Sequence, residues 1–311
     1  MPPLCKGRWH AQAMAEGLYK NHKPEICEYR RLFHYITVGS LIKYYERVLC
    51  RVDGFKKITS RENPLIKLVS SLQKSAAARR ENGLFVLEGL RLCTDACDNG
   101  IRFDKLIVSF SAAERHAEKI AEFAKNAEDC TAVPDALFKK ISDTENPQGI
   151  TALCKIPKTE SADIKKDGKY VALENINDPA NLGAVSRTAE ALGADGLILS
   201  AGSCDPYSPK ALRASMGTLL RMPIFEFGNF PAEMKSCGLK FYACVPSSLA
   251  ESISNVKFFP GCAVMIGNEA NGLTEETKAA AYKKITIPMR GRAESLNAAA
   301  AAAIAVWEMM K

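Results

Sequence analysis

The pattern of apolar and polar residues divides the 311-residue chain into three parts. Residues 1–55 show no helical or alternating period that persists. From residue 58, apolar residues recur at helical spacing up to Leu72, and apolar runs at 85–87 and 106–108 then predict short strands. Stretches at 90–97 and 137–141 predict further helices. We therefore expect a small α/β domain over residues 56–155.

Residues 156–168 are charged, contain a glycine and are poor in apolar residues, which predicts a linker between domains. Beyond this linker, short apolar runs recur, and helix-competent stretches separate most of them. The runs lie at residues 170–173, 196–199, 223–227, 241–245, 263–266 and 285–288. Continuous apolar runs between helices are typical of parallel strands that are buried on both faces. Residues 169–311 are therefore predicted to form a second α/β domain on a parallel sheet.

Residues 1–55 are expected to be a poorly ordered extension of uncertain origin. Their opening sequence, PLCKGRWHAQAMAEGL, resembles translated intergenic repeat DNA, which indicates a start codon placed too far upstream. No apolar core precedes a small-residue cleavage site, and acidic residues argue against a transit peptide.

Composition narrows the class of protein. Apolar residues make up 47% and charged residues 25%, as in ordinary globular proteins, and no apolar run is long enough to span a membrane. Lysine and arginine outnumber aspartate and glutamate by 42 to 35, and the net charge of +7 suits a polyanionic partner. The eleven cysteines are never spaced as C-x-x-C, so neither a disulfide framework nor a zinc site is indicated. We expect a reducing, cytoplasmic location.

Several familiar kinds of active site are missing from the second domain's sequence. It has neither the three-glycine dinucleotide turn nor the phosphate-binding loop GxxxxGK[ST]. All four histidines lie at or before residue 116, so a serine hydrolase triad cannot be assembled there. Any catalysis in this domain must use another base.

Three polar, glycine-containing segments instead follow apolar strands, at the sheet edge where open α/β folds bind ligands. In the first, NINDPANLGAVSRTAEALGA, Asn181 is expected to cap a helix that begins at Leu182. Arg187 lies roughly 9 Å further along that helix, and its long side chain can reach back to the same pocket. The alternative is that Asn181 only caps the helix and that Arg187 pairs with Glu190 or another acid on the surface.

The other two segments are MIGNEANGL and IPMRGRAESLNAAAAAAI. In the first of these, Gly267 ends a strand and Gly272 permits a turn before a new helix, with close backbone approach to a ligand as one use. Alternatively, both glycines serve only the turn and Glu269 is a solvated loop acid. In the second, a strand extends to residues 288–289, and Ser295 or Asn297 can cap a terminal helix.

Taken in this order, the three segments resemble the three motifs of the SpoU (TrmH-type) RNA ribose 2'-O-methyltransferases of the SPOUT superfamily. FVLEGLRLCTDACDNG and its surroundings resemble the ribosomal-L30e-like substrate-binding domain of many members. The resemblance implies an α/β fold in which a SPOUT domain, with a parallel sheet and a deep trefoil knot, follows a smaller L30e-like domain. It also implies a homodimer, S-adenosylmethionine as the cofactor, and no metal.

The resemblance assigns roles to individual residues. Arg187 matches the catalytic arginine of the family. The polar positions that line the same pocket are matched by Asn181, Glu269, Ser295 and Asn297. The expected cofactor contacts are Gly267, Ile287, Met289 and Leu296.

Methyl transfer to a ribose hydroxyl requires alignment and deprotonation, because a hydroxyl is a poor nucleophile at neutral pH. Free arginine has a pKa above about 12, so we favour Arg187 as a phosphate clamp that also stabilises the developing alkoxide. It would act as a base only if its pKa were strongly perturbed.

The first domain is expected to supply affinity for RNA. Candidate phosphate contacts are Lys67, Lys74, Arg79, Arg80 and Arg91, with a solvated surface charge as the alternative for each. Ribosomal RNA of the 23S type is the expected substrate, favoured over transfer RNA by analogy with the family's domain composition. The alternatives are a transfer RNA ribose, an RNA base, or a catalytically silent RNA-binding or ribosome-assembly protein.

Overall fold

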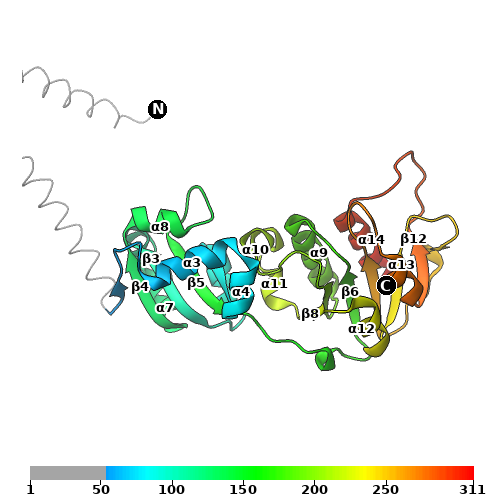
Figure 1. The fold of residues 1–311 in the computed structure, drawn as a ribbon, viewed down its shortest axis with the longest axis horizontal. Coiled ribbons are helices and arrows are strands. Elements are labelled where there is room, and N and C mark those ends of the chain that lie inside the picture. The colour runs from blue at the N-terminus through cyan, green and yellow to red at the C-terminus, as the bar shows by residue number, and fades with distance from the viewer. Residues whose placement is uncertain (1–53) are drawn as a thin grey trace, which may run out of the picture. The chain divides into compact units, whose positions relative to one another are not determined.

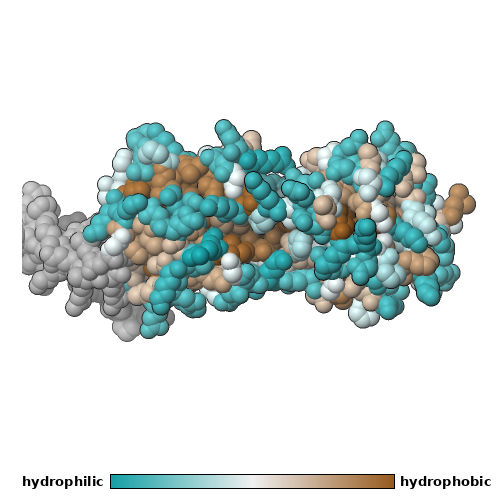
Figure 2. Space-filling model, turned by 90° about the horizontal axis from the view of Figure 1, so that it is seen from below, coloured by the Kyte–Doolittle hydropathy of each residue, from teal (hydrophilic) through white to brown (hydrophobic). Residues whose placement is uncertain are grey.

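The structure is a computed structural model that describes residues 54–311. Two sheets, each with its own helices, make up this part of the chain (Figure 1). The extension expected at residues 1–55 lies outside the described residues, apart from Gly54 and Phe55. Polar residues cover much of the face seen in Figure 2, with smaller apolar areas between them. Within residues 54–311, no helix is long and apolar enough to cross a membrane.

The first domain contains a five-stranded mixed sheet with the strand order β1-β4-β3-β5-β2. Its strands are β1 (Lys56–Lys57), β2 (Leu84–Glu88), β3 (Phe103–Ser109), β4 (Ala127–Val133) and β5 (Ile150–Lys155). β5 runs antiparallel to both of its neighbours, whereas β1, β4 and β3 are parallel to one another. The strands predicted at residues 85–87 and 106–108 correspond to β2 and β3.

Helices of the first domain surround this sheet, and the sequence of the first of them explains where that helix begins and which face it buries. The helices are α3 (Pro64–Lys74), α4 (Ala76–Asn82), α5 (Leu90–Asp98), α6 (Phe110–Arg115), α7 (Ala117–Lys125) and α8 (Asp135–Ile141). α3 begins after Asn63, whose side-chain oxygen accepts a hydrogen bond from the Leu65 amide at 2.9 Å, and Pro64 occupies its first turn. The apolar faces of α3 and α8 then join one buried cluster with the sheet.

The second domain contains a seven-stranded sheet with the order β10-β12-β9-β11-β6-β7-β8, and every neighbouring pair in it is parallel. Its strands are β6 (Lys169–Leu173), β7 (Gly196–Ser200), β8 (Ile224–Phe227), β9 (Lys240–Cys244), β10 (Glu251–Ser252), β11 (Cys262–Ile266) and β12 (Lys283–Thr286). The central strands β6, β7 and β11 are almost wholly buried, which explains their continuous apolar sequences. The predicted parallel α/β sheet is confirmed.

One strand ends earlier than its apolar pattern predicted. The run at residues 285–288 was expected to be a strand, but β12 stops at Thr286. Pro288 has no amide hydrogen and cannot donate to a sheet ladder, so the strand cannot extend through it.

The helices of the second domain complete its layers. They are α9 (Pro179–Leu192), α10 (Pro209–Ser215), α11 (Thr218–Arg221), α12 (Phe230–Ser236), α13 (Glu275–Ala280) and α14 (Ala298–Met310), with the 3-10 turn η2 (Ile253–Asn255). A further 3-10 turn, η1 (Ser161–Asp163), lies in the segment predicted to be the linker. α9 packs against α10 on one side and α14 on another. Gly183 of α9 makes the first of these contacts possible, because a Cβ there would lie 2.6 Å from that of Ala214. The contact between α9 and α14 places the C-terminal helix beside the first α-helix of the domain.

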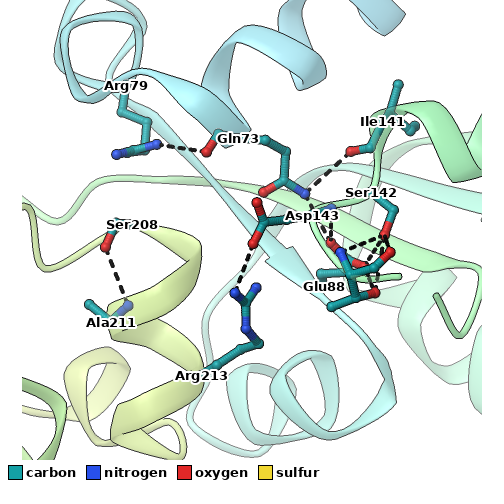
Figure 3. Close-up of polar contacts among 10 residues, drawn as sticks. Gln73, Arg79, Glu88, Ile141, Ser142, Asp143, Ser208, Ala211 and Arg213 are labelled. Carbon is teal, nitrogen blue, oxygen red and sulfur yellow. Dashed lines mark hydrogen bonds and ion pairs between the residues drawn. The ribbon is translucent and has the colours of Figure 1, made fainter. Parts of the chain in front are cut away.

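Arginine–aspartate ion pairs connect the two domains. Arg79 Nε lies 2.6 Å from Asp205 Oδ2, and Arg213 Nη2 lies 2.8 Å from Asp143 Oδ2. Figure 3 shows the second pair beside a cluster in which Glu88 accepts hydrogen bonds from the loop that carries Asp143. An aromatic pair with ring centroids 5.0 Å apart, Phe85 and Tyr207, adds an apolar contact. These contacts fasten α4, β2 and the loop after α8 to the region around α10.

Candidate active site

α9 starts three residues earlier than the sequence predicted, and this changes the role of Asn181. The helix begins at Pro179, and Asp178 is its N-cap, accepting a hydrogen bond from the Ala180 amide at 3.0 Å. Aspartate followed by proline is a favourable cap and first-turn pair. Asn181 lies inside the first turn instead, where it is only 9% exposed. The prediction that Asn181 caps the helix was wrong.

Residues from all three polar segments meet through two side-chain hydrogen bonds. The Asn181 amide group donates to Glu269 Oε1 at 2.8 Å. The Asn297 amide group in turn donates to the Asn181 carbonyl oxygen at 3.0 Å. Asn297 also caps α14, since its side-chain oxygen accepts from the Ala299 amide at 2.9 Å. We call this arrangement the Glu269–Asn181–Asn297 chain.

The carboxylate of Glu269 is the charged end of this chain. Partial burial works to raise its pKa, but the hydrogen bonds it accepts outweigh burial and lower the pKa below the usual value. The strongest donor is the Asn181 side chain, and the backbone amides of Asn177 and Asp178 approach at 3.3 and 3.4 Å. Glu269 is therefore ionised at neutral pH and fastens the 267–273 loop to the start of α9. The alternative of a purely solvated loop acid is excluded.

A cavity of about 280 Å³ lies beside Glu269. Its walls come from the loop after β11, the end of β9, the segment after β12 and the start of α14. The predicted site residues that line it are Gly267, Glu269, Ile287, Met289, Ser295 and Leu296. Asn181, Asn297 and Arg187 are not among the lining residues. Asn181 connects to the cavity wall through its hydrogen bond to Glu269, and Asn297 lies between the lining residues Leu296 and Ala298.

The 267–273 loop is held in a tight hairpin that depends on its glycines. Asn268 and Gly272 exchange two backbone hydrogen bonds, of 3.1 and 2.9 Å. A Cβ on Gly267 would lie 2.2 Å from the carbonyl carbon of Gly272, so only glycine fits there. Gly272 itself has a φ of +68°, a conformation that glycine adopts without strain. The first glycine thus makes room for backbone within the loop.

Sequence reasoning missed the buried carboxylate that positions this loop from behind. Glu174 follows β6 and is 3% exposed. It accepts hydrogen bonds from the amide and hydroxyl of Thr274, both at 2.8 Å, and from the Thr277 hydroxyl at 2.6 Å. The end of β6 is thereby tied to the first turn of α13. Lys278 of α13 was missed as well, although it lines the cavity, because a lysine on a short helix looks like ordinary surface.

Arg187 is exposed on α9 and does not form the surface pair that was the alternative to a role in the site. Its proposed partner Glu190 is bound by Arg221, whose Nη2 lies 2.7 Å from Glu190 Oε2. Arg221 also reaches Asp95 of the first domain at 2.5 Å. Within residues 54–311 the Arg187 guanidinium makes no hydrogen bond or ion pair.

The five candidate phosphate contacts of the first domain separate into two groups. Lys67, Lys74, Arg80 and Arg91 are exposed. Arg79 is 4% exposed, because its guanidinium pairs with Asp205 and donates to backbone carbonyl oxygens of α3. The expectation that Arg79 contacts phosphate was wrong: its charge is already used to join the two domains.

Comparison with known proteins identifies the family. Residues 168–307 match the SpoU rRNA Methylase family, and residues 63–152 match the MRM3-like substrate binding domain. A crystal structure of an AdoMet-bound rRNA methyltransferase from Sinorhizobium meliloti is 30% identical, with a TM-score of 0.71, over 82% of this chain and 97% of that one. The chain belongs to the SpoU methylase family. The resemblance of its three motif segments to SpoU enzymes is thus confirmed.

Two curated relatives of this SpoU protein are named for the nucleotides they modify. The 23S rRNA (guanosine(2553)-2'-O)-methyltransferase RlmP of Bacillus subtilis is 28% identical over 82% of this chain and 99% of its own length. The 23S rRNA (uridine(2479)-2'-O)-methyltransferase of Streptomyces viridochromogenes is 27% identical over 84% of this chain and 94% of its own. Both similarities extend across the two domains.

Proposed function

We propose that this SpoU protein transfers a methyl group from S-adenosylmethionine to a ribose 2'-hydroxyl of ribosomal RNA. The observation that carries the proposal is the Glu269–Asn181–Asn297 chain, because it joins all three motif segments beside a cavity lined by the expected cofactor contacts. The names of the two curated relatives support 23S-type ribosomal RNA as the substrate.

The residues around the cavity suit S-adenosylmethionine. Ile287, Met289 and Leu296 offer apolar surface to a purine ring, and the backbone of the 267–273 loop offers amide and carbonyl groups to the polar parts of the molecule. The ionised carboxylate of Glu269 favours a ligand that carries positive charge. When bound, S-adenosylmethionine supplies an electrophilic methyl group attached to a sulfonium sulfur.

The protein's own groups must orient the ribose hydroxyl and stabilise the charge that develops on its oxygen. Ser295 is exposed at the cavity, and we assign it a hydrogen bond to the ribose. Asn181 and Asn297 keep Glu269 and the start of α14 in register. Arg187 presents a planar fork of donors that matches a phosphate group, and we assign it the phosphate next to the target nucleotide.

We also propose a homodimer in which Arg187 of one subunit serves the cavity of the other, since Arg187 does not line the cavity of its own chain. Arg187 lies on the outer face of α9, which packs beside α14. On α14, Ile304 and Trp307 are 38% and 54% exposed. Exposed apolar side chains on a helix beside α9 suit a self-complementary interface between two copies.

Trp307→Glu tests the dimer, with Leu249→Glu as the matched control, because Leu249 is 96% exposed on a loop outside α9 and α14. We expect sedimentation to find the Trp307→Glu variant monomeric and methyl transfer to be lost. The control variant should remain dimeric and active. A Trp307→Glu variant that sediments like the wild type would rule out this interface.

We further propose that the C-terminal segment is threaded as a trefoil knot. α14 contacts α9, β11 and η2, and η2 belongs to the connection between β9 and β11. Such contacts are expected if residues 287–311 pass through that connection before they reach α9. An experimental density map traced through residues 240–311 tests the proposal, and an unthreaded tail would refute it.

Arg187→Ala tests the reaction when methyl transfer and calorimetry with S-adenosylmethionine are measured on the same samples. We expect the wild type to bind the cofactor and to methylate ribosomal RNA. The variant should fold and bind the cofactor normally but lose methyl transfer, because an exposed arginine supports no core. Full activity in the variant would refute the role of Arg187. A wild type without saturable binding heat would favour a silent RNA-binding protein, and a preference for transfer RNA would favour that substrate.

A further inference from the structure

A basic groove lies between α3 and α8 in the first domain, and the function proposed above does not account for it. The groove encloses about 450 Å³. Its lining residues are Arg61, Glu62, Ile66, Lys67, Ser70, Ser71, Lys74, Leu137, Lys140 and Ile141. They come from two segments about seventy residues apart, so the groove could not be found from either segment alone.

Charge in the groove is unbalanced. Four cationic side chains face one acidic side chain, Glu62. Glu62 lies 2.5 Å from Lys67, but the two side chains are 81% and 60% exposed, and an ion pair this exposed contributes little. Arg61, Lys74 and Lys140 have no acidic partner within residues 54–311. The groove therefore holds several cations whose charge is not neutralised by the protein.

Three lysines along the sheet of the same domain are paired with acids. Lys56 and Lys105 share Asp129, at 3.0 and 3.4 Å. Lys155 approaches Glu128 at 3.5 Å. These three lysines are neutralised within the domain, whereas Arg61, Lys74 and Lys140 leave a local excess of positive charge at the groove, which favours an anionic partner there.

The floor of the groove is apolar, whereas its rim is basic. Ile66, Leu137 and Ile141 are 5%, 5% and 3% exposed and belong to the buried cluster under α3 and α8. Ser70, whose hydroxyl can donate a hydrogen bond, is also a lining residue. A nucleic-acid backbone matches this arrangement, because its phosphates can meet the cations while sugar carbons lie against the apolar floor.

We propose that the α3/α8 groove binds the phosphodiester backbone of the RNA substrate, at a segment separate from the nucleotide that is methylated. Lys140 and Arg61 join Lys67 and Lys74 as phosphate contacts. This inference rests on the proposed function for the identity of the nucleic acid, but the groove's affinity is measured without methyl transfer.

The experiment compares Lys74→Gln/Lys140→Gln with Arg102→Gln/Lys125→Gln, a control that removes the same charge from exposed positions outside the groove. Binding of a fluorescein-labelled RNA hairpin is followed by anisotropy at several salt concentrations. For two lost phosphate contacts, the slope of log affinity against log salt should fall by roughly 1.4 to 1.8 in the groove variant. The control should keep the wild-type slope.

Three outcomes would overturn the proposal. In the first, the groove variant keeps the wild-type slope. In the second, both variants lose affinity equally, which would mean a general effect of net charge. Alternatively, polyglutamate displaces the hairpin as well as unlabelled RNA does, which would indicate an acidic protein partner. Methyl transfer is then measured with ribosomal RNA, and the groove variant should show a raised KM with most of its kcat. If the wild type transfers no methyl group, the proposed function fails while the binding result still decides the groove.

Discussion

Asn181→Ala perturbs the Glu269–Asn181–Asn297 chain at its centre. The substitution removes the donor to Glu269 at 2.8 Å and the acceptor of the Asn297 amide at 3.0 Å. A hydrogen bond to a charged group contributes about 1.5–3 kcal/mol, and one between neutral groups about 0.5–1.5 kcal/mol. Because Asn181 is nearly buried, we expect the free energy of unfolding to fall by about 2–4 kcal/mol at pH 7.

The pH dependence of this loss has a definite sign. The pKa of Glu269 is lowered in the folded protein, so its stabilising effect is present above the ordinary carboxyl pKa and is lost as pH falls through the lowered value. Unfolding by urea, followed by circular dichroism from pH 7 downward, should find the difference between wild type and Asn181→Ala shrinking in acid. In a Glu269→Gln background the same substitution should cost less and depend little on pH.

A double-mutant cycle with Asn297→Ala isolates the bond between the two amides. Each single substitution removes that bond. The loss of unfolding free energy in the double variant should therefore be about 1 kcal/mol smaller than the sum of the losses in the two single variants. Asn229→Ala is the matched control, since Asn229 caps α12 in the same way and takes no part in the chain. The costs of Asn181→Ala and Asn229→Ala should simply add. If the costs of Asn181→Ala and Asn297→Ala add in the same way, the argument that the three segments are coupled here is refuted.

The remaining predictions concern the loop and the domain contact. Gly267→Ala should abolish S-adenosylmethionine binding in calorimetry, because its Cβ would lie 2.2 Å from backbone. Gly272→Ala should cost only about 1–2 kcal/mol of stability, because its Cβ would enter open space and only the positive φ is strained. Equal losses of cofactor binding in the two variants would contradict this difference. Glu174→Gln should lower the urea midpoint and weaken cofactor binding, because it loses charge-assisted bonds to α13; an unchanged midpoint would count against it. Arg79→Ala should cost about 3–5 kcal/mol by stranding Asp205 without changing the salt slope of RNA binding, and a reduced slope would restore its phosphate role.

The sheet of the second domain could be predicted from sequence because strands buried on both faces need continuous apolar runs. β6 and β11 have such runs, and their positions agree with the prediction. The start of α9 could not be predicted in the same way. Asp178 and Asn181 are both favourable caps, and the choice depends on Pro179 in the first turn and on the carboxylate of Glu269, which comes from a distant segment.

The candidate site depended on contacts that no local pattern contains. Asn181 is separated by 88 residues from Glu269 and by 116 from Asn297, and only the family resemblance placed them in one pocket. Arg79 and Arg80 are neighbours on one helix and look alike in sequence. Which of them is buried depends on Asp205, 126 residues away from Arg79, and on how the two domains dock. The role of Glu174 could not be predicted either, because its burial and its hydrogen bonds depend on Thr274 and Thr277, about 100 residues further along the chain.

The most direct test of the reaction is the chemical position of the transferred methyl group. Ribosomal RNA is incubated with the wild-type protein and isotopically labelled S-adenosylmethionine, digested to nucleosides, and analysed by mass spectrometry. We predict the label in a single nucleoside methylated on its ribose 2'-oxygen, and none after incubation with Arg187→Ala. Ribose methylation by this site would be contradicted by label on a base. It would also be contradicted if the protein binds the cofactor but the RNA acquires no label.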